Sequence, residues 1–130
     1  MVAEQARAVQ AWQRGDVLLL LDRSGVPLGR LTVRQVGGFA AECAFESLPA
    51  FSPHRALFEE DSRLARQLVT DDSPEVFARV QTVQGELQAL GLTLRAQDGH
   101  LLRDFLLGIE GECAEFRAMN SERSSADNAF

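Results

Sequence analysis

The segment from Asp16 to Glu46 constrains the fold more than any other part of this sequence. Val17–Leu21 is an unbroken apolar run, which is typical of a strand that is covered on both faces. Two further runs, 30–34 and 39–46, alternate apolar and polar residues with a period of two. Because successive side chains of a strand point to opposite faces, the segment predicts a three-stranded antiparallel meander with one apolar face. The rest of the chain must then cover that face.

Two amphipathic helices are predicted after the meander. The pairs Ser52-Pro53 and Ser73-Pro74 each provide a capping residue followed by proline at the first helical position. We expect the first helix to span residues 53–69 and the second to span residues 74–90. Only a few residues separate them, so they should form an antiparallel helical hairpin.

The last third of the chain predicts short strands. Residues 92–95 read as a strand, and Asp98-Gly99 is a strong hairpin signal, so residues 101–109 should form the return strand. Another turn then leads to a strand over 113–118. The expected fold class is therefore α+β: an antiparallel sheet built from the β-meander and C-terminal β-hairpins, with the helical hairpin packed on one face.

The length of 130 residues is appropriate for one domain. We expect an N-terminal helical extension over residues 1–15, a single α+β domain over 16–119 and a flexible polar tail over 120–130. Trp12 is expected to dock the extension on the sheet. The first residues have no apolar signal core and no run is long enough to span a membrane, so a cytoplasmic protein without membrane contact is expected.

Charge and composition limit the function classes. The net charge is −6, which disfavours a nucleic-acid partner because phosphate binding needs clustered positive charge. All 13 basic residues are arginine and lysine is absent, which indicates a bacterial gene of high GC content. The turn and core pattern that begins with Asp22, Gly25 and Leu28-Gly29 resembles that of small, uncharacterised bacterial α+β proteins over residues 16–118. That resemblance implies no known activity, cofactor or catalytic residue.

Asp61 is the most informative candidate site residue. It falls near the middle of the apolar stripe of the first helix, where an unpaired carboxylate is costly. Asp61 is therefore either an acid in a binding pocket, with His54 on the same side of the helix, or the partner of an arginine such as Arg79 or Arg95. The second interpretation is the favoured one.

Arg30 and Arg34 share the polar face of the second strand, while Glu42 and Glu46 share that of the third. These residues form either an anion-binding patch or, as the favoured interpretation, cross-strand charge pairs on a solvated face.

Cys43 and Cys113 are the two cysteines, and both are expected as buried free thiols on strands. The cysteines and histidines lack the paired spacing of a zinc site, so no metal is expected.

The leading functional hypothesis is a small, non-catalytic cytoplasmic module that binds a protein partner or a second copy of itself. No phosphate loop, dinucleotide fingerprint, nucleophile elbow or zinc signature is present, so no catalytic residue and no cofactor are predicted. The alternative is a small-molecule-binding protein or an enzyme with a cleft near Asp61 and His54.

Overall fold

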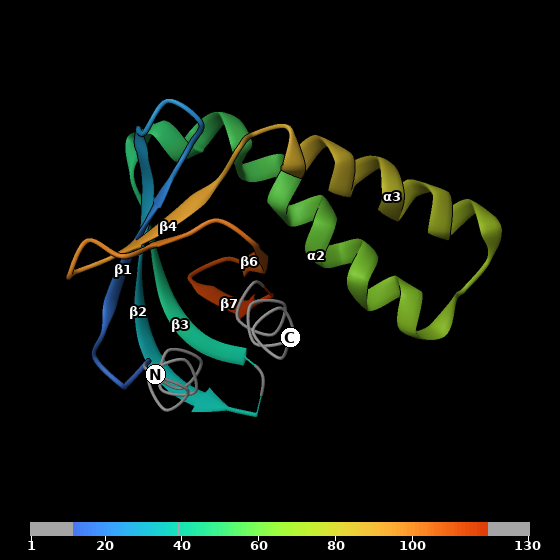
Figure 1. The fold of residues 1–130 in the computed structure, drawn as a ribbon. Coiled ribbons are helices and arrows are strands. Elements are labelled where there is room, and N and C mark those ends of the chain that lie inside the picture. Colours follow the sequence, from blue (N-terminus) through green and yellow to red (C-terminus); the bar gives the residue numbers. More distant parts are fainter. Residues whose placement is uncertain (1–11, 39, 120–130) are drawn as a thin grey trace, which may run out of the picture.

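The computed structural model describes residues 12–38 and 40–119, which form one seven-stranded antiparallel sheet with a helical hairpin beside it (Figure 1). The α+β fold class predicted from the sequence is therefore confirmed. The strands are β1 (Val17–Leu21), β2 (Pro27–Gly37), β3 (Ala40–Ser47), β4 (Thr93–Ala96), β5 (Leu101–Leu102), β6 (Phe105–Glu110) and β7 (Cys113–Ala118). The helical elements are the 3-10 helix η1 (Pro49–His54) and the α-helices α2 (Arg55–Thr70) and α3 (Pro74–Gln88).

The sheet is strongly curled, because its two edge strands follow each other directly in the chain. The strand order is β5-β4-β1-β2-β3-β7-β6, and only Arg103 and Asp104 separate β5 from β6. The sheet must therefore bend until the end of β5 lies near the start of β6, and Figure 1 shows the resulting curl. The prediction of one return strand over 101–109 is wrong in this respect. The chain bends between the two strands, so β5 pairs with β4 while β6 pairs with β7.

The main core lies inside the curl of the sheet. The predicted alternation of β3 is confirmed, since Ala41, Cys43 and Phe45 are all buried. β1 is fully covered on one face only, because its alternate side chains at positions 17 and 19 remain half-buried. The inward-facing strand residues in this core are Leu18, Leu20, Leu28, Leu31, Val33, Ala41, Cys43, Phe45, Leu94, Leu102, Ile109, Ala114 and Phe116.

The start of α2 differs from the prediction. The 3-10 helix begins at Pro49 and already contains Ser52, so Ser52 is not the N-cap of the α-helix. His54 occupies the N-cap position and makes no capping hydrogen bond through its side chain. The physical reason is the burial of Phe51, whose ring lies 5.0 Å from the Phe45 ring centroid and holds this turn against the core. The second cap is confirmed, because the Ser73 hydroxyl accepts a hydrogen bond from the backbone N–H of residue 76.

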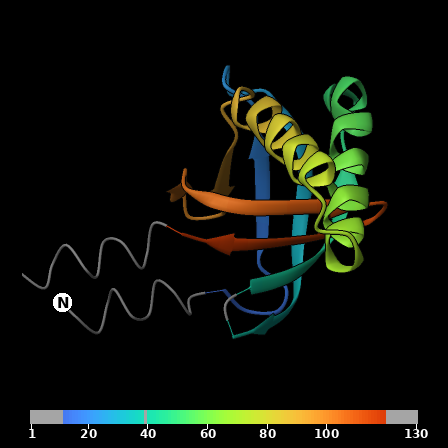
Figure 2. The same cartoon turned by 90° about the vertical axis from the view of Figure 1, so that its right-hand side faces the viewer.

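The helical hairpin is attached to the sheet through α2. Figure 2 shows the two helices side by side, with β6 next to α2. The Ser62 hydroxyl donates a 2.8 Å hydrogen bond to the backbone carbonyl of Ile109, and Arg66 forms an ion pair with Glu110. The predicted antiparallel pairing of the helices is confirmed. Three buried side chains outside the main core belong to the hairpin itself: Leu64, Val76 and Val83.

The predicted N-terminal helix falls mostly on residues 1–11, which lie outside the described residues, as does the predicted tail over 120–130. The described residues 12–15 are not helical but lead into a turn at Gly15. Trp12 docks on the sheet as expected, with its ring 5.6 Å from that of Phe116 in an edge-to-face contact. Within the part of the chain that the structure describes, neither helix is long and apolar enough to cross a membrane.

Candidate functional site

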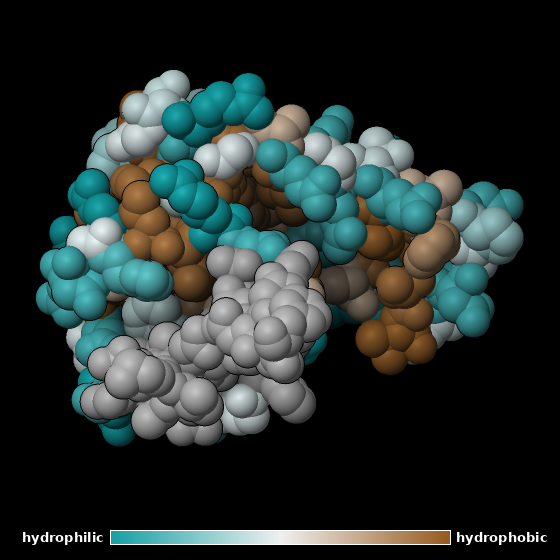
Figure 3. Space-filling model, viewed as in Figure 1, coloured by the Kyte–Doolittle hydropathy of each residue, from teal (hydrophilic) through white to brown (hydrophobic). Residues whose placement is uncertain are grey.

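A cleft of about 520 Å³ lies between the helical hairpin and the strands β6 and β7. The recess between the sheet and the hairpin shows brown, apolar surface in Figure 3. Such a volume is typical of small-molecule sites, which have largely apolar walls and a few polar groups. The apolar walls are made mainly by the side chains of Phe58, Leu87, Leu92, Phe105, Leu107 and Phe116.

A second cleft, of about 390 Å³, adjoins the first beneath α2. Four residues line both clefts: Asp61 and Ala65 from α2, Gly108 from β6 and Glu115 from β7. A Cβ atom built on Gly108 would meet nothing within 4 Å, so this strand position leaves open space beside the helix. The two small residues therefore keep the junction of the clefts accessible.

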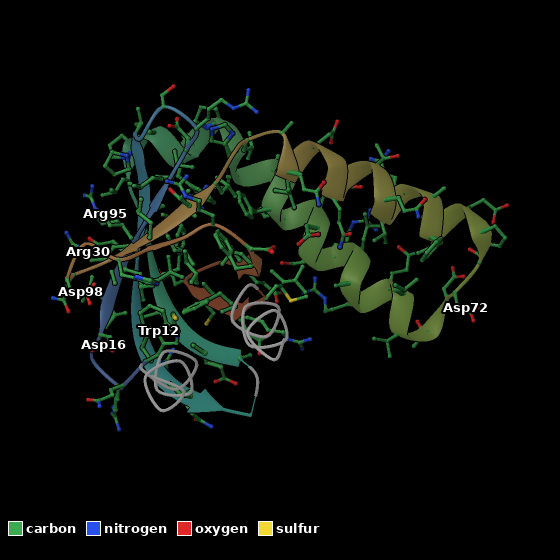
Figure 4. All side chains as sticks on the ribbon, viewed as in Figure 1. Trp12, Asp16, Arg30, Asp72, Arg95 and Asp98 are labelled. Atoms are coloured by element: carbon green, nitrogen blue, oxygen red, sulfur yellow. The ribbon has the colours of Figure 1, made fainter. Side chains whose placement is uncertain are left out.

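Asp61 lies at this junction without a partner among the described residues. Its side chain is half-buried, and this burial raises the pKa of the Asp61 carboxyl above its usual range. The expectation that an arginine neutralises Asp61 is wrong. Arg79 donates to the neighbouring Glu60 at 2.9 Å, and Arg95 lies on the side of the sheet remote from the hairpin (Figure 4). Asp61 thus lines both clefts with a carboxyl group that no described arginine neutralises.

The sheet surface beside Asp61 carries negative charge. Glu115 on β7 lies directly opposite Glu42 on β3 and directly opposite Gly108 on β6. Like charges at opposed strand positions are unfavourable, and neither neighbour of Glu115 is basic. Arg66, which lines the second cleft, already pairs with Glu110. The junction of the clefts is therefore suited to a positively charged group.

His54 does not join Asp61 in the site. It lies at the end of η1, seven positions before Asp61, and it lines neither of the two clefts. At about 1.5 Å of rise per residue, the two side chains are too far apart for direct contact. The structure therefore offers no acid–base pair of these two residues.

The two strand arginines are also separated. Arg30 pairs with Glu46 across the strands at 3.4 Å, and both side chains are largely exposed. This agrees with the favoured interpretation of cross-strand charge pairing, which contributes little to stability at exposed positions. Arg34 sits at a register shift between Val33 and Gln35, and it lines the second cleft.

The two cysteines point to opposite faces of the sheet. Cys43 lies opposite Ala114 and faces the core, where burial raises the pKa of its thiol to about 12. Cys113 lies opposite Ala44, the residue after Cys43, so its side chain points to the other face of the sheet and is exposed. The expectation that both thiols are buried is therefore wrong for Cys113. Both thiols are free. The described residues contain no group of three or more His, Cys, Asp or Glu side chains that could hold a metal ion.

Sequence reasoning missed Gly108 and Glu115 as site residues. A glycine in the interior of a strand can mark a close approach or an open space, and Gly108 is such a glycine. That signal was present in the sequence, whereas the position of Glu115 in the lining of the same clefts as Asp61 depends on the strand order.

No protein-family model matches this chain, and no curated protein or solved structure is significantly similar to it. The chemistry of the site must therefore be deduced from its own residues.

Proposed function

We propose that this protein binds a small molecule in the cleft between its helical hairpin and β6–β7, without catalysing a reaction. The observation that carries the proposal is the cleft itself: about 520 Å³, with apolar side chains in its walls and with the half-buried carboxyl group of Asp61, which has no partner among the described residues. Burying a polar group without a partner is unfavourable. A ligand that satisfied Asp61 and covered the apolar walls would remove that cost.

An NMR-monitored screen of small apolar compounds tests this proposal. Binding in the cleft would shift the backbone amide signals of Leu92 and of residues 105–108, which line it. Ala65→Leu would place a larger side chain at the junction of the clefts, so it should weaken binding strongly. Ala56→Leu is the matched control, because this exposed position on the same helix lines neither cleft. Equal binding by both variants would place the ligand elsewhere and contradict the proposal.

A second candidate function, contact with a protein partner or a second copy, is favoured by apolar side chains on the hairpin. Val69 near the end of α2 is 83% exposed, and Phe77 in the first turns of α3 is 52% exposed. Aromatic side chains such as Phe77 are enriched at the centres of interfaces, and contiguous exposed apolar surface marks interaction sites. Sedimentation of the wild type against Val69→Ser would show whether the chain associates with itself through the hairpin.

The proposed setting is the reducing cytoplasm of a bacterium. Two free thiols support a reducing compartment, and the arginine-only basic composition supports the bacterial assignment. The net charge of −6 supports a ligand other than nucleic acid.

A further inference from the structure

We infer that the ligand of this cleft carries a cationic amino group on an apolar body, and that the amino group pairs with the carboxylate of Asp61. This inference rests on the proposed ligand-binding function and adds the chemical class of the ligand. Three features of the cleft support it: the composition of its walls, the lack of a partner for Asp61, and the access to that carboxylate.

The walls determine the body of the ligand. Phe58 from α2, Leu87 from α3 and Phe105 and Leu107 from β6 surround the space on the helix and sheet sides. Aromatic and aliphatic surface of this kind gains free energy when an apolar group displaces water from it. The same cleft is also lined by polar and charged residues, among them Gln84, Gln88, Arg103, Asp104 and Arg117.

The carboxylate of Asp61 determines the charge of the ligand. It has lost part of its hydration by burial and has gained no hydrogen bond or ion pair from the described residues. An ammonium group would restore both a countercharge and hydrogen bonds, and such charge-assisted bonds are stronger than neutral ones. A ligand carboxylate or phosphate would instead approach two acids, because Glu115 lines the same space.

None of the arginines that line the clefts neutralises the Asp61 carboxylate. Arg66 pairs with Glu110, and Arg117 has an interaction of its own. Arg34 and Arg103 are exposed, and neither forms an ion pair with Asp61. Asp61 therefore has no countercharge from the described part of the chain.

The carboxylate is also accessible. Its neighbours at the junction of the two clefts include Ala65 and Gly108, and the latter leaves open space where a side chain would stand. An amino group on a flexible chain can therefore reach the carboxylate while the apolar body stays in the larger cleft.

Three probes with the same eight-carbon chain test the inference at neutral pH: octylammonium, octanol and octanoate. Titrations followed by calorimetry and by the amide signals of residues 105–108 would give the three affinities. We expect octylammonium to bind the wild type about tenfold more tightly than octanol, because the ammonium group adds a countercharge to a hydrogen bond that the octanol hydroxyl can also donate. Octanoate should bind more weakly than octanol.

Asp61→Asn should remove the preference for octylammonium over octanol, so that the two probes bind this variant with similar affinity. Asp72→Asn is the matched control, since it makes the same charge change at the far end of the hairpin (Figure 4). It should keep the full preference. Asp61→Ser repeats the test with a smaller side chain in case the asparagine variant does not fold.

The outcomes separate the two proposals. If octanol and octylammonium bind the cleft equally, or if the preference survives in Asp61→Asn, the inference about the amino group is wrong while the ligand-binding function stands. If none of the three probes shifts the amide signals of the cleft, the proposed function itself fails.

Discussion

Gly29 on β2 is held in place by an aromatic ring, and its replacement by alanine should destabilise the fold. A Cβ atom at this position would lie 2.4 Å from Cε1 and 2.6 Å from Cζ of Phe45, and 3.1 Å from the backbone oxygen of Glu46. Contacts below 3.0 Å force one of the groups to move. The carbonyl belongs to the paired β3 strand, so the ring of Phe45 is the group that must shift.

The ring of Phe45 has little freedom to move. It is 4% exposed, and its centroid lies 5.0 Å from that of Phe51, which in turn lies 5.4 Å from Phe58. Overpacking of a close-packed core costs about 1–3 kcal/mol, while replacing glycine in a strand returns roughly 0.5–1 kcal/mol. The difference of these two ranges leads us to expect that Gly29→Ala lowers the free energy of unfolding by about 1 kcal/mol, and by at most about 2.5 kcal/mol. For a domain of about 100 residues, each kcal/mol corresponds to roughly 4–8 °C in Tm.

Urea denaturation of Gly29→Ala would measure this cost, with Gly37→Ala as the matched control. Gly37 lies on the same strand, and a Cβ atom there would meet nothing within 4 Å. A second comparison uses Phe45→Leu, whose smaller side chain should accept the added methyl group, so Gly29→Ala should cost less in that background. The reasoning would be refuted if Gly29→Ala matched Gly37→Ala, or if it cost the same with and without the Phe45 ring.

Three further predictions follow from single positions. Burial raises the pKa of Asp61, so the free energy of unfolding falls as pH rises from the unfolded-state pKa of about 3.9 toward the higher folded-state pKa. Asp61→Asn should therefore be more stable than the wild type at neutral pH and equal to it in acid. Equilibrium denaturation at both pH values checks the sign, and a destabilised variant at neutral pH would show that Asp61 has a stabilising partner. Gly85 lies inside α3, and a Cβ atom added there would meet nothing within 4 Å, so Gly85→Ala should raise the free energy of unfolding by about 0.5–1 kcal/mol. Thermal or urea denaturation would show this gain, and an unchanged or lower value would contradict the helix assignment there. Cys113 should react with a thiol reagent in the native protein while Cys43 stays unmodified until unfolding, because burial protects the Cys43 thiol and raises its pKa to about 12. Mass spectrometry of labelled peptides distinguishes the two cysteines, and labelling of Cys43 in the native protein would contradict its placement in the core.

The features that sequence reasoning predicted well depend on neighbouring residues. The Ser73 hydroxyl caps α3 by accepting a hydrogen bond from the backbone N–H of residue 76, three positions later in the chain. The turn after β4 forms because Asp98 accepts a hydrogen bond from the backbone N–H of His100 while Gly99 adopts a φ of +90°. The cap and the turn each form through hydrogen bonds between residues a few positions apart, so a short stretch of sequence is enough to predict them.

The features that it missed depend on contacts between distant residues. The break between β5 and β6 has no strong local signal, because it arises where the chain exchanges one pairing partner for another. Ser52 has the sequence of a helix cap, yet the burial of Phe51 starts the helical turn earlier. Asp61 has the expected position on the apolar stripe, but whether an arginine reaches it depends on tertiary packing, and Arg79 reaches Glu60 instead.

The two-residue link between β5 and β6 has a consequence for the folding kinetics. Two strand pairings join parts of the chain that are distant in sequence, β1 with β4 and β3 with β7. Once β4 has docked on β1, the short link brings β6 and β7 close to β3, so most of the loop-closure entropy is lost in the first of these events. We therefore expect both pairings to form in one cooperative step, on the millisecond-to-second timescale of β-rich domains, and their amide protons to exchange together when the sheet opens.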